Sequence, residues 1–483
     1  MSPSPPGSRA RLWLLVALLI TAQGAASLLG SFRADDWINL ERGAAAWSTD
    51  GARAVWATLN PFGLYRPLID VWHGLWLRVF GLNAPPMMAL LIANLLLQSV
   101  LLARLVRARG GSRETAAMAT AAIWAQPNTY TWTTLWISNA TGALMVTATL
   151  LAAVLHARAV RKLTRGEGAG WTLGAMSVVT LLGALCKEDI VLLPLFIAIL
   201  EVARSPRMSG SERRASIAVT GALLAIAAGY AAFRLLILPT PQTGEDRYHL
   251  RLGMHIPRNI LFFAAHLGAL PIVALLLARL RMPTAFRERA TESSIESAAR
   301  REAIAGFVWA VAALLLYLPI SGRPSYGYLL APAFGVAYGV AHLLTWLAAR
   351  ADAPPRGSPG ILWTHALLAL TLTAGALYMI QWHRFGELER GLVRDLRRDA
   401  ATLPQGAHVA FIDAGRGETP AGRTIFNLIA TSEPSAFTRI ALGRPDVTAS
   451  TLDVPGARAD SSFSIEANAV HVVRWGRILP ASP

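Results

Sequence analysis

The chain has 483 residues, of which 54% are hydrophobic and only 15% are charged. An ordinary globular chain spends about a quarter of its residues on charge, so this composition excludes a string of soluble domains. The net charge of +16 is spread over short connections between apolar blocks rather than gathered on one soluble module, which argues against a nucleic-acid-binding protein and for a membrane protein.

Eleven apolar segments have about the length that a helix needs to cross roughly 30 Å of hydrocarbon. They cover residues 12–30, 87–106, 114–127, 138–157, 171–186, 188–203, 215–238, 259–280, 303–320, 326–349 and 361–380. With a cytoplasmic N-terminus, every even-numbered connection carries the arginines expected on the cytoplasmic side. The sequence therefore predicts an all-α, multi-pass protein of the inner (cytoplasmic) membrane whose C-terminus is extracytoplasmic. A cleaved signal peptide in place of the first segment is the alternative, and it too leaves residue 31 outside.

Two domains follow from the change in composition after Tyr378. Residues 1–380 are predicted to form the transmembrane domain. It includes a long first outer loop over residues 31–86, in which Pro67–Val79 has an amphipathic pattern. The charged stretch 282–302 is predicted to be a solvated cytoplasmic helix.

Residues 381–483 regain charge and are predicted to form a small extracytoplasmic α/β domain. A helical pattern over Phe385–Arg398 leads into His408–Asp413, which has the pattern of a strand. Asn427–Ala430 and Ala469–Trp475 are further candidates for regular structure.

An acidic pair, Asp35 and Asp36, stands a few residues beyond the first apolar segment. Carboxylates beside a bilayer are costly and point to function. Two adjacent carboxylates repel, so each favours a cation, a metal ion or a hydrogen-bond donor nearby. They could deprotonate an acceptor hydroxyl or hold a divalent metal ion against a phosphate. The structural alternative is that they solvate the loop, with Asp36 as the N-cap of the following helix.

Cationic side chains of the predicted outer connections are candidates for binding a phosphate. Lys187 lies between two apolar blocks, where it binds a phosphate as a point charge or neutralises Glu188. Arg66 and Arg323 could clamp a phosphate through two nitrogens, or contact lipid headgroups. Glu245 belongs to the polar loop 239–257, which is either a mobile substrate loop or, as its composition favours, a plain solvated loop.

In their order along the chain, these motifs resemble the GT-C class of membrane glycosyltransferases. They are most similar to the protein O-mannosyltransferases and to the transmembrane O-mannosyltransferases with tetratricopeptide repeats. The matching pieces span roughly residues 12–350 and are Asp35-Asp36, Arg66-Pro67-Leu68, Phe80–Asn83, Asn94–Gln98, Lys187-Glu188 and Arg323–Pro332.

The resemblance implies a cell-envelope enzyme that transfers a sugar from a polyprenyl-phosphate donor to an acceptor at the outer face, with inversion. It implies Asp35 as the base and Asp36 as a ligand of a divalent metal ion or of the acceptor. Arg66, Lys187 and Arg323 would bind the donor phosphate. The implied partners are the lipid-linked donor, membrane lipids and a glycan, lipid or protein acceptor, with no nucleic acid and no cofactor other than the metal ion.

The sequence departs from the family pattern at two histidines and one acid. Gln98 and Gln126 occupy the histidine positions, and the acid expected within Asn128–Trp136 is missing. Glu188, Asp70 or Glu245 could replace that acid. The alternatives are a non-catalytic or transport protein, such as a flippase or assembly subunit for lipid-linked glycans, and a GT-C-like scaffold that binds such glycans without turnover.

Overall fold

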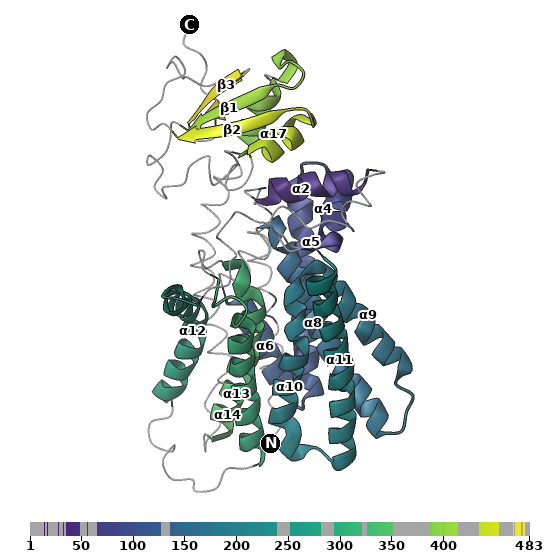
Figure 1. The fold of residues 1–483 in the computed structure, drawn as a ribbon. Coiled ribbons are helices and arrows are strands. Elements are labelled where there is room, and N and C mark those ends of the chain that lie inside the picture. The colour runs from purple at the N-terminus through teal and green to yellow at the C-terminus, as the bar shows by residue number, and fades with distance from the viewer. Residues whose placement is uncertain are drawn as a thin grey trace.

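The computed structural model describes a large part of the chain. The described residues are 35–48, 65–126, 136–238, 252–281, 294–320, 326–350, 389–398, 400–413, 434–453, 469–474 and 477–478, with positions 14, 17, 28, 32, 56, 387 and 467. They form a bundle of helices and, toward the C-terminus, a four-stranded sheet (Figure 1). The predicted first and last membrane segments, 12–30 and 361–380, lie almost wholly outside these residues.

Each of the nine other predicted segments contains a helix. These are α5 (Ala84–Ala108), α6 (Arg113–Trp124), α8 (Ala140–Thr164), α9 (Gly170–Cys186), α10 (Leu193–Arg204), α11 (Gly210–Leu236), α12 (His255–Arg281), α13 (Ser294–Leu314) and α14 (Leu330–Arg350). Within the described residues, four helical stretches are long and apolar enough to cross a membrane, Ala84–Ala108, Ile137–Thr164, Gly210–Leu236 and Gly327–Ala349. The protein is therefore a multi-pass membrane protein. The number of eleven membrane crossings and the side of the membrane on which each terminus lies stay predictions.

The connections between the helices gather at two opposite ends of the bundle. Contacts between distant segments define one end, called here the α2 end: Asp36 with Ser138, Arg66 with Glu188, and Lys187 with Tyr317. Another set of contacts joins the opposite end: Arg109 with Glu201 and Glu302. α5 runs from one end to the other, from Ala84 near α4 to Arg109 (Figure 1).

Two helices of the predicted outer loop cover the α2 end. α2 (Asp35–Ala46) packs on α4 (Pro67–Phe80), and α4 confirms the amphipathic helix predicted over Pro67–Val79. A Cβ at position 43 would lie only 2.8 Å from the carbonyl carbon of His73, so the two backbones touch. Glycines at positions 43 and 74 permit this close crossing.

Small residues also bring α13 and α14 together. A Cβ at position 335 would lie 2.7 Å from the backbone nitrogen of Ala310, and one at 339 would lie 3.1 Å from the carbonyl oxygen of Ala303. Gly335 and Gly339 are four residues apart, the spacing that places two small residues on one helix face. Close backbone packing therefore joins these two helices.

The solvated helix predicted over residues 282–302 is confirmed as helix over residues 294–302, but the prediction that its charges are solvated is wrong for Glu296 and Glu302. Residues 294–302 form the start of α13, in which Glu296 and Glu302 are buried. Burial is possible because Glu302 accepts hydrogen bonds from cationic and hydroxyl partners. Residues 282–293 lie outside the described residues.

The C-terminal part contains a mixed sheet in the order β2-β1-β3-β4. Its strands are β1 (His408–Asp413), β2 (Thr448–Asp453), β3 (Ala469–Arg474) and β4 (Arg477–Ile478). β1 runs parallel to β2 and β3, and β4 is antiparallel to β3. The predicted strand His408–Asp413 and the candidate at Ala469–Trp475 are confirmed, as is helix over residues 389–398, whereas Asn427–Ala430 lies outside the described residues. The domain boundary and the extracytoplasmic location stay predictions.

This C-terminal part is seated on α2 (Figure 1). Helix α17 (Pro434–Leu442) places the ring of Phe437 edge-on to Trp37, with ring centroids 4.8 Å apart. Next to them, the Arg439 guanidinium pairs with the Glu41 carboxylate through two nitrogens. An aromatic contact and an ion pair therefore join the two parts beside the acidic pair.

Candidate functional site

The acidic pair lies in the first turn of α2. Asp35 begins the helix, and its side chain lies outside what the structure describes. Asp36 is fully buried. Its Oδ1 accepts a hydrogen bond from the backbone N–H of Ser138 at 2.6 Å and another from the Ser138 hydroxyl. Because α2 begins at Asp35, the structural alternative that made Asp36 an N-cap is wrong; Asp36 instead joins α2 to the short helix η1 (Ile137–Asn139), which leads into α8.

The described residues around Asp36 do not form a metal site, and the metal ion stays a prediction. Among the described residues, no three His, Cys, Asp or Glu side chains lie close enough to share a metal ion. The Asp36 oxygen that faces Ser138 already accepts two hydrogen bonds. The predicted metal ion therefore has no described ligand set at Asp36, and the side chains of Asp35 and Glu245 lie outside the described residues.

Asp70, a candidate for the missing acid, holds α2 against α4. Its carboxylate accepts from Nη2 and Nε of Arg42, at 2.6 and 3.2 Å. One turn later His73 is buried, with Nε2 3.5 Å from the carbonyl oxygen of Ile137. Burial lowers the pKa of His73, and the Asp70 carboxylate offsets this in part. Asp70 therefore has a structural partner, and His73 is held neutral beside it.

Arg66 and Glu188, 122 residues apart, form a two-point ion pair. Nε and Nη2 of Arg66 donate to the two carboxylate oxygens at 3.0 and 3.1 Å. Burial opposes the charge of Arg66, but Glu188, with help from Asp189, outweighs it and raises the pKa of Arg66 above its ordinary value. A guanidinium has five N–H groups, so within the described part of the chain the pair leaves the Nη1 edge of Arg66 without a partner.

Lys187 is enclosed by a carboxylate and two aromatic rings. Its Nζ donates to the hydroxyl of Tyr317 at 2.8 Å and lies 2.6 Å from Oδ2 of Asp189. The ammonium also lies 5.1 Å from the ring centroid of Tyr317 and 5.6 Å from that of Tyr328, two rings that stack on each other. These are cation–π distances. Lys187 is thus neutralised mainly by Asp189 rather than by Glu188.

The structure brings several of the predicted site residues to one end of the fold. Lys187 and Glu188 are adjacent, and Arg66 pairs with Glu188. The short helix η5 (Tyr326–Leu329), which carries Tyr328, lies against the start of α8, where Gly327 is close to Gly142. Asp36 reaches the same region through Ser138. Arg323 and Glu245 lie outside the described residues.

Sequence patterns did not reveal the partners of these residues. Ser138, Arg42 and Tyr317 belong to no motif, and each is 28 or more residues from the side chain it contacts. Asp189 lies in the same charged run as Lys187, and this proximity was the one sign in the sequence that the two residues are partners.

The two glutamines at the expected histidine positions are buried, and each makes a contact between two helices. Gln98 donates from Nε2 to the Thr147 hydroxyl at 3.0 Å, joining α5 to α8. Gln126 donates to the carbonyl oxygen of Ala333 at 3.1 Å, joining the end of α6 to α14. Both side chains serve packing between helices in this protein.

Comparisons with known proteins give structural matches only. No protein-family model and no curated protein matches the chain. The fold is similar to the arabinofuranosyltransferase AftD from Mycobacteria, with 17% identity and a TM-score of 0.50 over 92% of this chain and 32% of that one. The Archaeoglobus fulgidus oligosaccharyltransferase tethered to an acceptor peptide matches with 11% identity and a TM-score of 0.43, over 89% of this chain and 63% of that one.

A second structure of the archaeal enzyme, AglB with an inhibitory peptide and a dolichol-phosphate, gives 11% identity and a TM-score of 0.42 over 89% of this chain and 64% of that one. The chain spans about a third of the length of the mycobacterial enzyme and just under two thirds of the archaeal one. At such low identity the likeness concerns the fold. It confirms the prediction made from the order of the motifs: the chain has the fold of the GT-C membrane glycosyltransferases.

Proposed function

We propose that this protein transfers a sugar from a polyprenyl-phosphate donor to an acceptor hydroxyl at the α2 end, on the extracytoplasmic face of the membrane. The observation that carries the proposal is the position of the acidic pair. On a GT-C fold, Asp35 begins a helix at the same end of the bundle where Arg66 and Lys187 lie. An acid and cations at a membrane surface are the groups that this reaction needs.

In the proposed reaction Asp35 is the base. The acceptor oxygen forms a bond to the anomeric carbon while the bond from that carbon to the phosphate oxygen breaks. The hydroxyl proton passes to the Asp35 carboxylate, and the electron pair leaves with the polyprenyl phosphate. A single displacement of this kind inverts the anomeric centre.

Asp36 positions this base rather than taking part in the step. Its two hydrogen bonds to Ser138 fix the first turn of α2 against the start of α8. Such support matters because a base contributes only when it lies within hydrogen-bond reach of the proton it accepts. In this proposal a metal ion has no part at Asp36.

The leaving phosphate is stabilised chiefly by Arg66. Glu188 orients the guanidinium through Nε and Nη2. In this proposal the Nη1 edge, which has no partner among the described residues, binds the donor phosphate. Lys187 contributes a point charge that is shared with Asp189. Arg323 remains a predicted third cation.

The test is sugar transfer in nanodiscs from radiolabelled polyprenyl-phosphate sugars, with arabinofuranose included because AftD is an arabinofuranosyltransferase. We expect Asp35→Asn to lower the rate by about 10²–10⁴-fold, the range of general base catalysis. Glu167→Gln is the control, because that carboxylate is exposed at the opposite end. Unchanged transfer by Asp35→Asn would refute the assignment of the base.

The runner-up function is a non-catalytic or transport protein for lipid-linked glycans. The replacement of two expected histidines by the packing residues Gln98 and Gln126 favours it. It predicts that polyprenyl phosphate binds with no sugar released, and that Asp35 and Asp36 are dispensable. Transfer that depends on Asp35 would exclude it.

A further inference from the structure

A cavity of about 410 Å³ lies where the C-terminal part meets the membrane domain. One wall is the helix over residues 389–398, and the other contains Phe32, Trp37 and residues 82–85. Asn83 and Ala84 stand at the start of α5, one of the helices long enough to cross the membrane. The cavity therefore lies at the level of a membrane surface, beside α2 and its acidic pair.

The C-terminal wall of the cavity is strongly cationic. Arg390, Arg394 and Arg397 line it together with Val393, at the spacing that places them on one helix face. Within the described part of the chain, neither Arg390 nor Arg394 pairs with a carboxylate. Arg397 donates from Nε to the carbonyl oxygen of Ala441. These three arginines share the lining with one carboxylate, that of the buried Glu389, so the lining carries a net charge of two positive charges.

The opposite wall adds a buried donor. Trp37 is 1% exposed and lines the cavity, and its indole N–H has no acceptor among the described residues. An indole nitrogen can only donate. A buried donor without an acceptor costs free energy, so such groups normally find a partner, which can be a ligand.

We propose that this cavity binds an oxyanion, a phosphate or carboxylate group of a ligand at the membrane surface. Arg390 and Arg394 match such a group because a guanidinium presents its N–H groups as a planar fork. Trp37 supplies a third donor from across the cavity. Phe32, Leu82 and Val393 add apolar surface for the rest of the ligand.

Two kinds of ligand carry such an oxyanion at a membrane surface, a lipid phosphate and an acidic glycan. A phosphate on a polyprenyl chain would reach the cavity from the bilayer, and the uronic acid or phosphate of a glycan would reach it from water. The proposal does not rest on sugar transfer, because binding is measured without turnover. If Asp35→Asn abolished transfer while binding persisted, the two functions would be separate.

The experiment is arginine modification by phenylglyoxal, followed by mass spectrometry, on the full chain in nanodiscs. The probes are polyprenyl phosphate in the bilayer and a uronic-acid oligosaccharide in solution. We expect one of them to protect Arg390 and Arg394, which identifies the source. Arg398 is the internal control, because it pairs with Asp395 and does not line the cavity. Absence of protection by both probes would overturn the proposal.

Binding of the protecting probe is then compared in three variants. Arg390→Gln with Arg394→Gln should weaken binding by about tenfold or more for each guanidinium. Trp37→Phe should weaken it severalfold, and Arg398→Gln should leave it unchanged. Equal binding by the double variant and the unaltered protein would contradict an oxyanion site here, whereas a thermal unfolding curve shows whether the variant is folded.

Discussion

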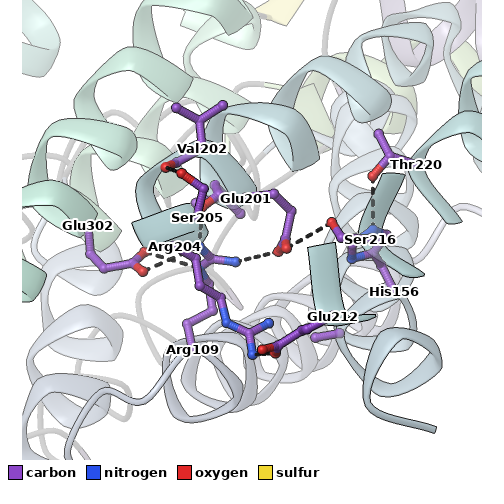
Figure 2. Close-up of polar contacts among 12 residues, drawn as sticks. Arg109, His156, Glu201, Val202, Arg204, Ser205, Glu212, Ser216, Thr220 and Glu302 are labelled. Atoms are coloured by element: carbon purple, nitrogen blue, oxygen red, sulfur yellow. Dashed lines mark hydrogen bonds and ion pairs between the residues drawn. The ribbon is translucent and has the colours of Figure 1, made fainter. Parts of the chain in front are cut away.

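The buried ion-pair network at the end opposite α2 gives the sharpest prediction about stability (Figure 2). Arg109 donates to Glu302 at 3.0 and 3.3 Å, to Glu201 at 2.8 Å, and to the carbonyl oxygen of Leu200. The side chains of Arg109 and Glu302 are only 3% and 2% exposed. This one residue therefore joins the end of α5 to α10 and α13.

The proposed change is Arg109→Met, which keeps most of the side-chain volume and removes the charge. Glu302 would keep Arg207 at 2.8 Å and the Tyr338 hydroxyl at 2.6 Å, and Glu201 would keep the Ser216 hydroxyl at 2.9 Å. Glu302 would then keep one guanidinium, whereas the carboxylate of Glu201 would lose the one that it contacts among the described residues. Breaking a buried ion pair from one side costs about 3–5 kcal/mol, so we expect a loss of free energy of unfolding of that order.

A double-mutant cycle with Glu302→Gln separates the pair from its surroundings. Arg109→Met with Glu302→Gln leaves Arg207 and Glu201 with balanced charges. The double change should therefore cost less than the sum of the two single changes, by about 0.5–3 kcal/mol. The free energy of unfolding is measured by denaturant titration of the detergent-solubilised protein.

The control is an exposed ion pair in the connection between α8 and α9. Arg165 and Glu167 are 3.7 Å apart and their side chains are 69% and 49% exposed. Arg165→Met should change the free energy of unfolding by less than about 1 kcal/mol. If Arg109→Met cost no more than this control, the buried network would not hold the helices together.

Two more predictions concern pH and helix packing. Because burial lowers the pKa of His73, the unfolded chain binds a proton there that the folded one does not, so stability should fall as pH drops below about 6.5, by up to roughly 1.4 kcal/mol per pH unit. His73→Gln should flatten that part of the stability curve, and an unchanged slope would contradict a buried neutral histidine. Gly335→Ala should destabilise by about 1–3 kcal/mol, since its Cβ would lie 2.7 Å from the Ala310 nitrogen. Gly229→Ala, where nothing lies within 4 Å of a Cβ, should change thermal stability little; similar results for both glycines would refute close packing of α13 on α14.

Apolar segment length and helix periodicity predicted most of the described fold. The segments from 87–106 to 326–349 all contain helix, and the strand over His408–Asp413 matches in both bounds. Both signals are local, because they depend on residues within one helix or strand. The failure at residues 294–302 has the same origin: a run of charges looks solvated until a distant partner such as Arg109 is placed beside it.

The candidate site was predictable in its residue types and not in its partners. The acidic pair, Arg66 and Lys187 stand out because charge next to apolar blocks is rare. Their contacts reach across the chain to Ser138, Glu188 and Tyr317. Such contacts depend on how the helices pack against one another, and the sequence of one segment alone does not reveal that packing.

These partners change where an incoming anion would be stabilised. At the α2 end three of the described cations form balanced pairs: Arg42 with Asp70, Arg66 with Glu188, and Lys187 with Asp189. A phosphate that approached such pairs would meet almost no net charge, and it could use only donor edges that the carboxylates leave free.

The helix over residues 389–398 has the opposite character, because Arg390 and Arg394 line a cavity without carboxylate partners among the described residues. Unpaired guanidiniums produce a positive potential that attracts anions, whereas paired ones mainly hold a geometry. The balanced pairs near Asp35 and the arginines that have no carboxylate partner among the described residues therefore suit the two proposed tasks, orientation of reacting groups at Asp35 and capture of an anionic ligand beside them.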